Sequence, residues 1–149
     1  HGKMKRTESM DHVACAAANG MQKGLPSMMQ SLGIIVFGCG GNRDRDKRPK
    51  MGAVASELSD FCVITSDNPR DEDSNQIIDD IVTGFKGDKF LAIESREEAI
   101  EKALDKALNE QAIVLIAGKG HEKTQEMKGE KIFFSDIEEV KKWVSKHES

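Results

Sequence analysis

Four consecutive residues, Asp67-Asn68-Pro69-Arg70, offer the most varied polar chemistry in this sequence. They supply a carboxylate, an amide and a guanidinium fork, and the proline restricts the backbone that carries them. This mixture suits a zwitterionic amino acid, whose ammonium group would pair with Asp67 and whose carboxylate would pair with Arg70. The alternative interpretation is structural, because Asp, Asn and Pro also form the turn that precedes many helices.

A second polar segment, residues 38–49, reads Gly-Cys-Gly-Gly-Asn-Arg-Asp-Arg-Asp-Lys-Arg-Pro. Its glycines would permit tight turns with exposed amides, and its charges, including Arg43, could hold an ionic ligand. A solvated loop of balanced charge is the alternative. The segment is no dinucleotide-binding fingerprint, because Arg43 stands where the third glycine of G-x-G-x-x-G belongs.

A third polar segment, residues 118–122, reads Gly-Lys-Gly-His-Glu. It lacks the Ser or Thr after Gly-Lys and the upstream glycine that a phosphate-binding P-loop requires. His121 and Glu122 are adjacent and so do not have the spacing of a helical metal-binding pair, which leaves no predicted metal site. We interpret Glu122 as a second acceptor for a ligand ammonium group.

Strands and helices have to position these three segments. Short apolar runs, rich in β-branched residues and without polar alternation, predict strands that are covered on both faces. Helical spacing of apolar residues, and Ser-x-x-Glu capping boxes at Ser95 and Ser135, predict helices. The predicted strands are residues 34–37, 61–64, 90–93 and 113–116; the predicted helices are residues 51–58, 77–85, 95–108 and a segment from 135.

This alternation predicts an α/β domain with a mainly parallel sheet, followed by a β-hairpin within residues 124–134. Ligands of such sheets bind beyond the carboxyl ends of the strands, where all three polar segments begin. We expect one domain over residues 1–149. Residues 1–32 are atypical, with a weak strand at 13–18 and an interrupted helix at 21–32.

Composition narrows the class of protein. The 22 Lys and Arg against 26 Asp and Glu give a net charge of −4 without a long basic run, which argues against nucleic acid as a partner. The three cysteines lack C-x-x-C spacing, which favours a reducing cytoplasm and no zinc site. The apolar runs are too short to span a membrane and no signal peptide is evident, so we expect a cytoplasmic location.

In order and spacing, the three polar segments together resemble motifs of the Mur ligase family, and within it of the branch that adds meso-diaminopimelate. The resemblance covers residues 33 to about 145. It implies a Rossmann-like, three-layer carboxy-terminal domain that binds the incoming amino acid, which would be meso-diaminopimelate or an analogue such as lanthionine. The residues that match the family's contacts to this amino acid are Arg43, Asp67, Asn68, Pro69, Arg70, Gly118 and Glu122.

The resemblance also implies a reaction. In this family ATP and Mg²⁺ activate the D-glutamate carboxyl of UDP-MurNAc-L-Ala-D-Glu as an acyl phosphate, which the diaminopimelate amine attacks during peptidoglycan synthesis. The phosphate loop, magnesium ligands and carbamylated lysine of the family's central ATP-binding domain are absent from this sequence. We therefore expect the chain alone to contain no catalytic residue, to hold no cofactor and to be inactive.

One departure from the family lies near the start of the chain. The family usually carries Asp-Tyr-Ala-His there, whereas this sequence is Ala-rich over residues 13–20. The aromatic and imidazole groups that would help to hold the nucleotide are missing. The alternative to a ligase domain is a stand-alone, non-catalytic module that binds a small ligand such as an amino acid or a nucleotide.

Overall fold

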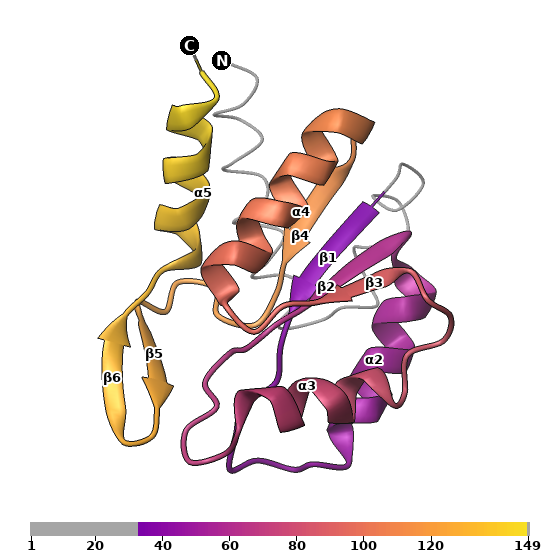
Figure 1. Cartoon of the computed structure of the whole chain (residues 1–149), viewed down its shortest axis with the longest axis vertical. Coiled ribbons are helices and arrows are strands. Elements are labelled where there is room, and N and C mark those ends of the chain that lie inside the picture. Colours follow the sequence, from indigo (N-terminus) through magenta and orange to yellow (C-terminus); the bar gives the residue numbers. More distant parts are fainter. Residues whose placement is uncertain (1–32, 149) are drawn as a thin grey trace.

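A computed structural model of the protein describes residues 33–148. Its framework is a four-stranded sheet with the strand order β3-β2-β1-β4 (Figure 1). All neighbouring strands in it are parallel, so helices supply the crossovers, as predicted. The strands are β1 (Gly33–Phe37), β2 (Phe61–Ile64), β3 (Phe90–Ala92) and β4 (Ile113–Ile116). The strand and helix predicted within residues 1–32, and the Ala-rich stretch there, lie outside the described residues.

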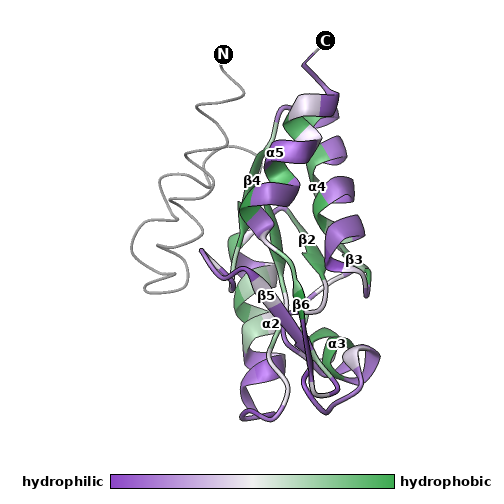
Figure 2. Ribbon diagram, turned by 90° about the vertical axis from the view of Figure 1, so that its left-hand side faces the viewer, coloured by the Kyte–Doolittle hydropathy of each residue, from purple (hydrophilic) through white to green (hydrophobic). Residues whose placement is uncertain are grey.

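Helices cover both faces of this sheet, which confirms the three-layer α/β fold. Successive residues of β1 point to opposite faces, so Ile35 and Phe37 join one hydrophobic core while Ile34 and Val36 join the other. Burial on both faces explains why the strands are unbroken apolar runs, seen as the green centre of Figure 2. One face is covered by α2 (Lys47–Leu58) and α3 (Ser74–Val82), the other by α4 (Arg96–Glu110) and α5 (Asp136–Lys146).

The helix starts follow local sequence signals. The side chains of Ser95 and Ser135 accept hydrogen bonds from the backbone N–H groups of Glu98 and Glu138, at 3.2 and 3.3 Å. Within the described part of the chain, the Glu98 side chain makes no return bond, so only half of that predicted capping box forms. Pro49 lies in the first turn of α2, as expected. No described helix is both long and apolar enough to cross a membrane.

β3 departs from the prediction. The apolar run 90–93 was expected to form a strand covered on both faces, but β3 ends at Ala92 and the Leu91 side chain is 44% exposed. The reason is its position at the edge of the sheet, where it pairs only with β2. An apolar run specifies a strand but not whether the helices reach far enough to cover it.

A β-hairpin follows the main sheet, as predicted. β5 (Thr124–Met127) pairs antiparallel with β6 (Glu130–Phe133), and Lys128 and Gly129 form the turn with positive φ angles of 50° and 81°. Two positive φ angles give a turn whose twist matches the strands. A parallel bridge between Met127 and Arg70 attaches the hairpin to the loop after β2. The hairpin therefore reaches one of the three polar segments.

Candidate functional site

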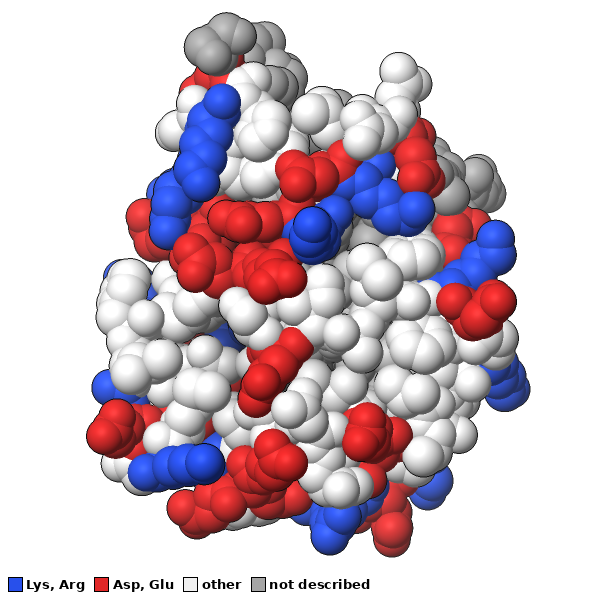
Figure 3. Space-filling model, viewed as in Figure 1, with Lys and Arg blue, Asp and Glu red and all other residues white. Residues whose placement is uncertain are grey.

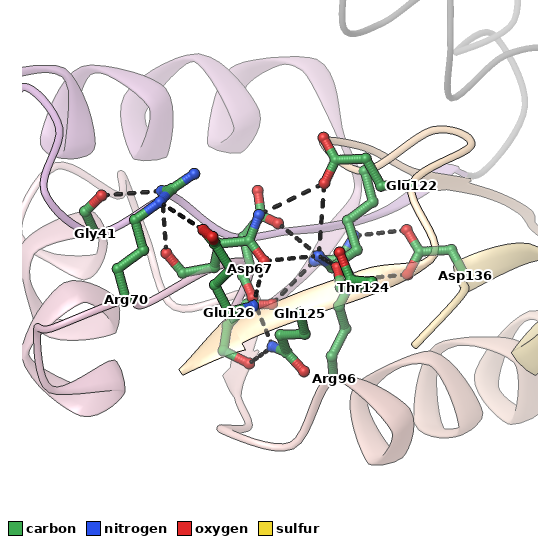
Figure 4. Close-up of polar contacts among 12 residues, drawn as sticks. Gly41, Asp67, Arg70, Arg96, Glu122, Thr124, Gln125, Glu126 and Asp136 are labelled. Carbon is green, nitrogen blue, oxygen red and sulfur yellow. Dashed lines mark hydrogen bonds and ion pairs between the residues drawn. The ribbon is translucent and has the colours of Figure 1, made fainter. Parts of the chain in front are cut away.

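The loops that follow β1, β2 and β4 meet beyond the carboxyl ends of these strands, where Figure 4 shows Gly41, Asp67 and Glu122, one from each loop. Asn68, in the loop after β2, bonds to both of the other loops. The N–H of Gly41 donates to the backbone carbonyl of Asn68 at 2.7 Å. The Lys119 ammonium donates to Asn68 Oδ1 at 3.1 Å, and Asn68 Nδ2 donates to Glu122 Oε1 at 3.5 Å. The three polar segments found in the sequence thus form one cluster, as their positions after parallel strands predict.

The glycines of the first segment allow close packing of backbone on backbone. A Cβ added to Gly41 would lie 1.8 Å from the Pro69 carbonyl oxygen, and one added to Gly38 would lie 2.2 Å from the Thr65 carbonyl oxygen. Neither glycine has a positive φ angle, and the Gly41 N–H is bonded within the protein. The expectation of an exposed amide was therefore wrong for Gly41, and both glycines let the two loops touch.

We predict that Gly41→Ala lowers the free energy of unfolding by about 1–3 kcal/mol, the usual cost of overpacking, because the new methyl group meets a fixed backbone carbonyl. Gly40→Ala is the matched control. Its methyl group would meet the end of the Arg70 side chain at 2.8 Å, and a side-chain end can shift more easily than a backbone carbonyl, so that variant should lose less than about 1 kcal/mol. Urea unfolding of both variants measures the difference, and equal losses would contradict the prediction.

Arg70 is held at both its backbone and its side chain. Its N–H donates to the Glu126 carbonyl oxygen at 3.0 Å, although its φ angle of 54° is unusual for a residue with a side chain. Its Nε donates to Glu126 Oε2 at 3.2 Å, and its Nη1 donates to the Gly41 carbonyl oxygen at 3.0 Å. Among residues 33–148, Nη2 has no hydrogen-bond partner. The guanidinium is therefore fixed, and the position next to Nη2 is its free edge.

Arg43 also lies close to Gly40. A Cβ added to Gly40 would lie 2.8 Å from Arg70 Nη1 and 3.5 Å from Arg43 Cγ, so both arginine side chains pass near this position. Arg43 is exposed and forms no ion pair with any residue that the structure describes. We call Arg43 and Arg70 the cationic pole of the site. Together they could bind a carboxylate.

Asp67 and Glu122 form an anionic pole beyond Asn68. The Glu122 side chain is 55% exposed and has one oxygen directed away from its contacts with Asn68 and Lys119. Asp67 Oδ1 is buried, 3.3 Å from the Lys119 ammonium, and has no aligned hydrogen bond within the described part of the chain. Both carboxylates retain capacity to accept a bond from a ligand ammonium group.

Sequence reasoning missed the role of Lys119. Its side chain is fully buried, and its ammonium contacts Asp67 and donates to Asn68 and to the Thr124 carbonyl oxygen at 2.9 Å. The flanking glycines, Gly118 and Gly120, have positive φ angles of 113° and 56°, which turn the backbone so that the lysine points inward. This ammonium is occupied within the protein and is not available to a phosphate group.

The role of a second residue, Arg96, was also not predicted: its side chain links the carboxyl ends of β2 and β4. It is completely buried and forms a two-pronged ion pair with Asp136, with donor–acceptor distances of 2.8 and 2.7 Å. The same guanidinium donates to the carbonyl oxygens of Ser66 at 3.0 Å and Ala117 at 3.1 Å. These carbonyls immediately precede Asp67 and Gly118. Arg96 therefore fixes the spacing of the loops that carry the anionic pole.

Arg48 fastens the loop that carries Arg43. Its buried guanidinium donates to Glu72 at 2.8 Å, to Asp80 at 2.9 Å and to the Gly40 carbonyl oxygen at 3.2 Å. Glu72 also accepts from the N–H of Asn42 at 2.6 Å. The hydrogen bond from Arg48 and, next, that from Asn42 hold the pKa of Glu72 below its usual value. The loop is thus tied to the start of α3.

This lowered pKa predicts a pH-dependent contribution to stability. Because Glu72 has a lower pKa in the folded chain than in the unfolded chain, its contribution is complete above the unfolded pKa of about 4.3 and is lost as pH falls through the folded pKa. Glu72→Gln should therefore be less stable than the natural chain at pH 7, and the difference should shrink in acid. Urea unfolding between pH 7 and pH 3 tests this; Glu130→Gln, which removes an exposed carboxylate without an ion pair among residues 33–148, is the control.

The two described cysteines do not contribute a reactive thiolate. Burial raises the pKa of both the Cys39 and Cys62 thiols to about 11, so both stay protonated at neutral pH.

Residues 33–148 contain no group of three or more His, Cys, Asp or Glu side chains placed to hold a metal ion. On the face drawn in Figure 3, acidic and basic side chains are interspersed.

Comparison with known proteins identifies the family. Residues 8–120, more than half of the chain, match the family described as "Mur ligase, glutamate ligase domain". The chain belongs to the Mur ligase family. The resemblance based on the three polar segments is thereby confirmed.

Relatives of this Mur ligase chain include named enzymes. It is 44% identical over 148 residues to UDP-N-acetylmuramoyl-L-alanyl-D-glutamate--2,6-diaminopimelate ligase of Chlorobaculum tepidum, covering 92% of this chain and 29% of that protein. It is 53% identical over 109 residues to the same-named ligase of Aquifex aeolicus, covering 72% and 22%. A solved structure of a ligase with this name matches with a TM-score of 0.75 and 34% identity, over 96% of this chain and 28% of that one. The Mur ligase chain thus spans less than a third of the length of these relatives.

Proposed function

We propose that this chain is the carboxy-terminal, amino-acid-binding domain of a cytoplasmic, ATP-dependent ligase that adds meso-diaminopimelate to UDP-MurNAc-L-Ala-D-Glu in peptidoglycan synthesis. The names of the relatives support the reaction. The observation that carries the binding role is the placement of a cationic and an anionic pole on either side of Asn68. One amino-acid head group, with its carboxylate and its ammonium group, needs both poles at once.

In this proposal the ligand carboxylate binds to the free edge of Arg70 and to Arg43. The ligand ammonium group binds to Glu122, which is the more exposed acceptor, and to Asp67, while Asn68 lies between the two head-group charges. The remaining two residues of the proposed set act through the backbone. The Pro69 carbonyl oxygen packs on Gly41, and the lack of a side chain at Gly118 keeps Asp67 Oδ2 uncovered, since a Cβ there would lie 3.3 Å from it.

The domain would contribute positioning to the reaction. It would hold one head group of diaminopimelate so that the amine at the other end faces the activated D-glutamate carboxyl, which turns a bimolecular encounter into an oriented one. ATP and Mg²⁺ do not fit this cluster, because the ammonium of Lys119 is enclosed by Asp67, Asn68 and Thr124. ATP supplies the phosphoryl group for activation, and we place its site and that of Mg²⁺ in the rest of the ligase.

Titration of the full 149-residue chain with meso-diaminopimelate, L-lysine and lanthionine, followed by amide chemical shifts, tests this proposal. We expect diaminopimelate to shift resonances of residues 43, 67–70 and 118–122, with low affinity because the site would be completed by closure onto another domain. 1,5-Diaminopentane, added as a fourth ligand, should shift them less because it has no carboxylate, whereas lysine has one complete head group and can occupy both poles of this chain. Equal responses to 1,5-diaminopentane and diaminopimelate would contradict the proposal, and binding of a nucleotide in place of any amino acid would favour the stand-alone module.

A further inference from the structure

The cationic pole contains an anion that belongs to none of the three motifs. Glu126, on β5, places Oε2 3.2 Å from Arg70 Nε, and about a third of its side chain is exposed. Its other oxygen has only a loose contact, 4.0 Å, with the exposed ammonium of Lys131. The hairpin therefore delivers a carboxylate to Nε of Arg70, on the guanidinium edge that Nε shares with Nη2 (Figure 4).

The anionic pole has the matching arrangement with the charges reversed. The Lys119 ammonium lies 3.3 Å from Asp67 and 3.8 Å from Glu122. At this pole, the carboxylates of Asp67 and Glu122 and the ammonium of Lys119 add up to one negative charge. At the cationic pole, the guanidiniums of Arg43 and Arg70 and the carboxylate of Glu126 add up to one positive charge. With the exposed Lys131 left aside, these six side chains carry one unneutralised charge of each sign.

We infer that Glu126 is an internal counter-ion that sets how strongly Arg70 binds a ligand carboxylate, and so helps to determine which amino acid the site selects. This inference rests on the proposed function. Without a ligand, the Glu126 carboxylate keeps a partly buried guanidinium paired and holds its plane in place. When a ligand carboxylate binds at Nη2, the negative charge of Glu126 lies beside it on the same guanidinium and weakens its binding. Glu126 therefore orients the Arg70 guanidinium but lowers its affinity for a ligand carboxylate.

Glu126→Gln separates charge from geometry. The amide oxygen can still accept from Arg70 Nε, the side chain keeps its size, and the backbone bond from the Arg70 N–H to residue 126 is unaffected. Only the negative charge is removed. We expect affinity for meso-diaminopimelate to rise by about three- to ten-fold, as expected for one partly screened charge. Affinity for 1,5-diaminopentane, which has no carboxylate, should not rise.

Two further variants of the full chain complete the test. Glu126→Ala removes the acceptor as well as the charge, so Arg70 loses its support and diaminopimelate should bind more weakly than to Glu126→Gln. Glu130→Gln is the matched control, because it removes one negative charge from the same hairpin at an exposed residue without an ion pair among residues 33–148. Its effect should stay below about two-fold.

The readout is the dissociation constant from amide chemical shifts, with the spectrum of each variant showing that it is folded. A purely structural role for Glu126 predicts weaker binding for every substitution. If the natural chain binds diaminopimelate and Glu126→Gln binds it equally or more weakly, the counter-ion inference is wrong and the proposed function stands. If the natural chain does not bind diaminopimelate, the proposed function fails and the inference fails with it.

Discussion

Arg70→Ala, placed in a complete ligase that contains this domain, should reduce its use of meso-diaminopimelate by roughly 30- to several-thousand-fold while changing its use of lysine little. The range corresponds to about 2–5 kcal/mol, the usual cost of truncating one member of a desolvated charge pair. Diaminopimelate has a carboxylate that lysine lacks, and the free edge of Arg70 is the proposed partner of that carboxylate. With lysine bound, the guanidinium would instead face an ammonium group.

Lysine use is the internal control for a structural effect of this substitution. Arg70 also donates to the Gly41 and Asn68 carbonyl oxygens, so its loss could loosen both loops. Loosened loops would lower the use of both amino acids, whereas loss of the carboxylate contact lowers only one. Arg70→Lys should restore activity only in part, since a point charge does not reproduce the guanidinium fork. An unchanged preference for diaminopimelate over lysine in Arg70→Ala would show that Arg70 is only a turn residue.

Arg96→Met should destabilise the chain by about 3–5 kcal/mol, the usual cost of breaking a buried ion pair by removing one partner. The substitution leaves the buried carboxylate of Asp136 without its cation. It also leaves the Ser66 and Ala117 carbonyl oxygens without their donor at the ends of β2 and β4. Because these carbonyls precede Asp67 and Gly118, the loops of the anionic pole should be disturbed as well.

Urea unfolding of single and double variants distinguishes this mechanism from a general loss of packing. Arg96→Met combined with Asp136→Leu removes both charges and should recover part of the stability that the single variant loses. Lys141→Met is the control, because its ion pair with Glu138 is exposed and should contribute less than about 1 kcal/mol. A loss of under about 1 kcal/mol for Arg96→Met would mean that the buried pair does not stabilise the fold.

Most strands and helices, and the place where the motifs meet, could be predicted from the amino-acid sequence. The strands, the serine caps at Ser95 and Ser135, and the Lys-Gly hairpin turn were predictable because each depends on residues only a few positions apart. The alternation of strands and helices then implied a parallel sheet, and a parallel sheet places the residues after its strands at one edge. The three motifs were specific enough to indicate the family.

Tertiary structure alone decided which charges are paired inside the protein and which remain for a ligand. Arg70 and Glu126 are 56 positions apart in the chain, Lys119 and Asn68 are 51 apart, and Arg96 and Asp136 are 40 apart. No local pattern distinguishes a lysine or arginine that becomes buried against such a partner from one that stays in water. The energy of a charge depends on burial and on groups brought close by the fold, so Lys119, Arg96 and Glu126 could be assigned roles only after the loops and the hairpin were in place.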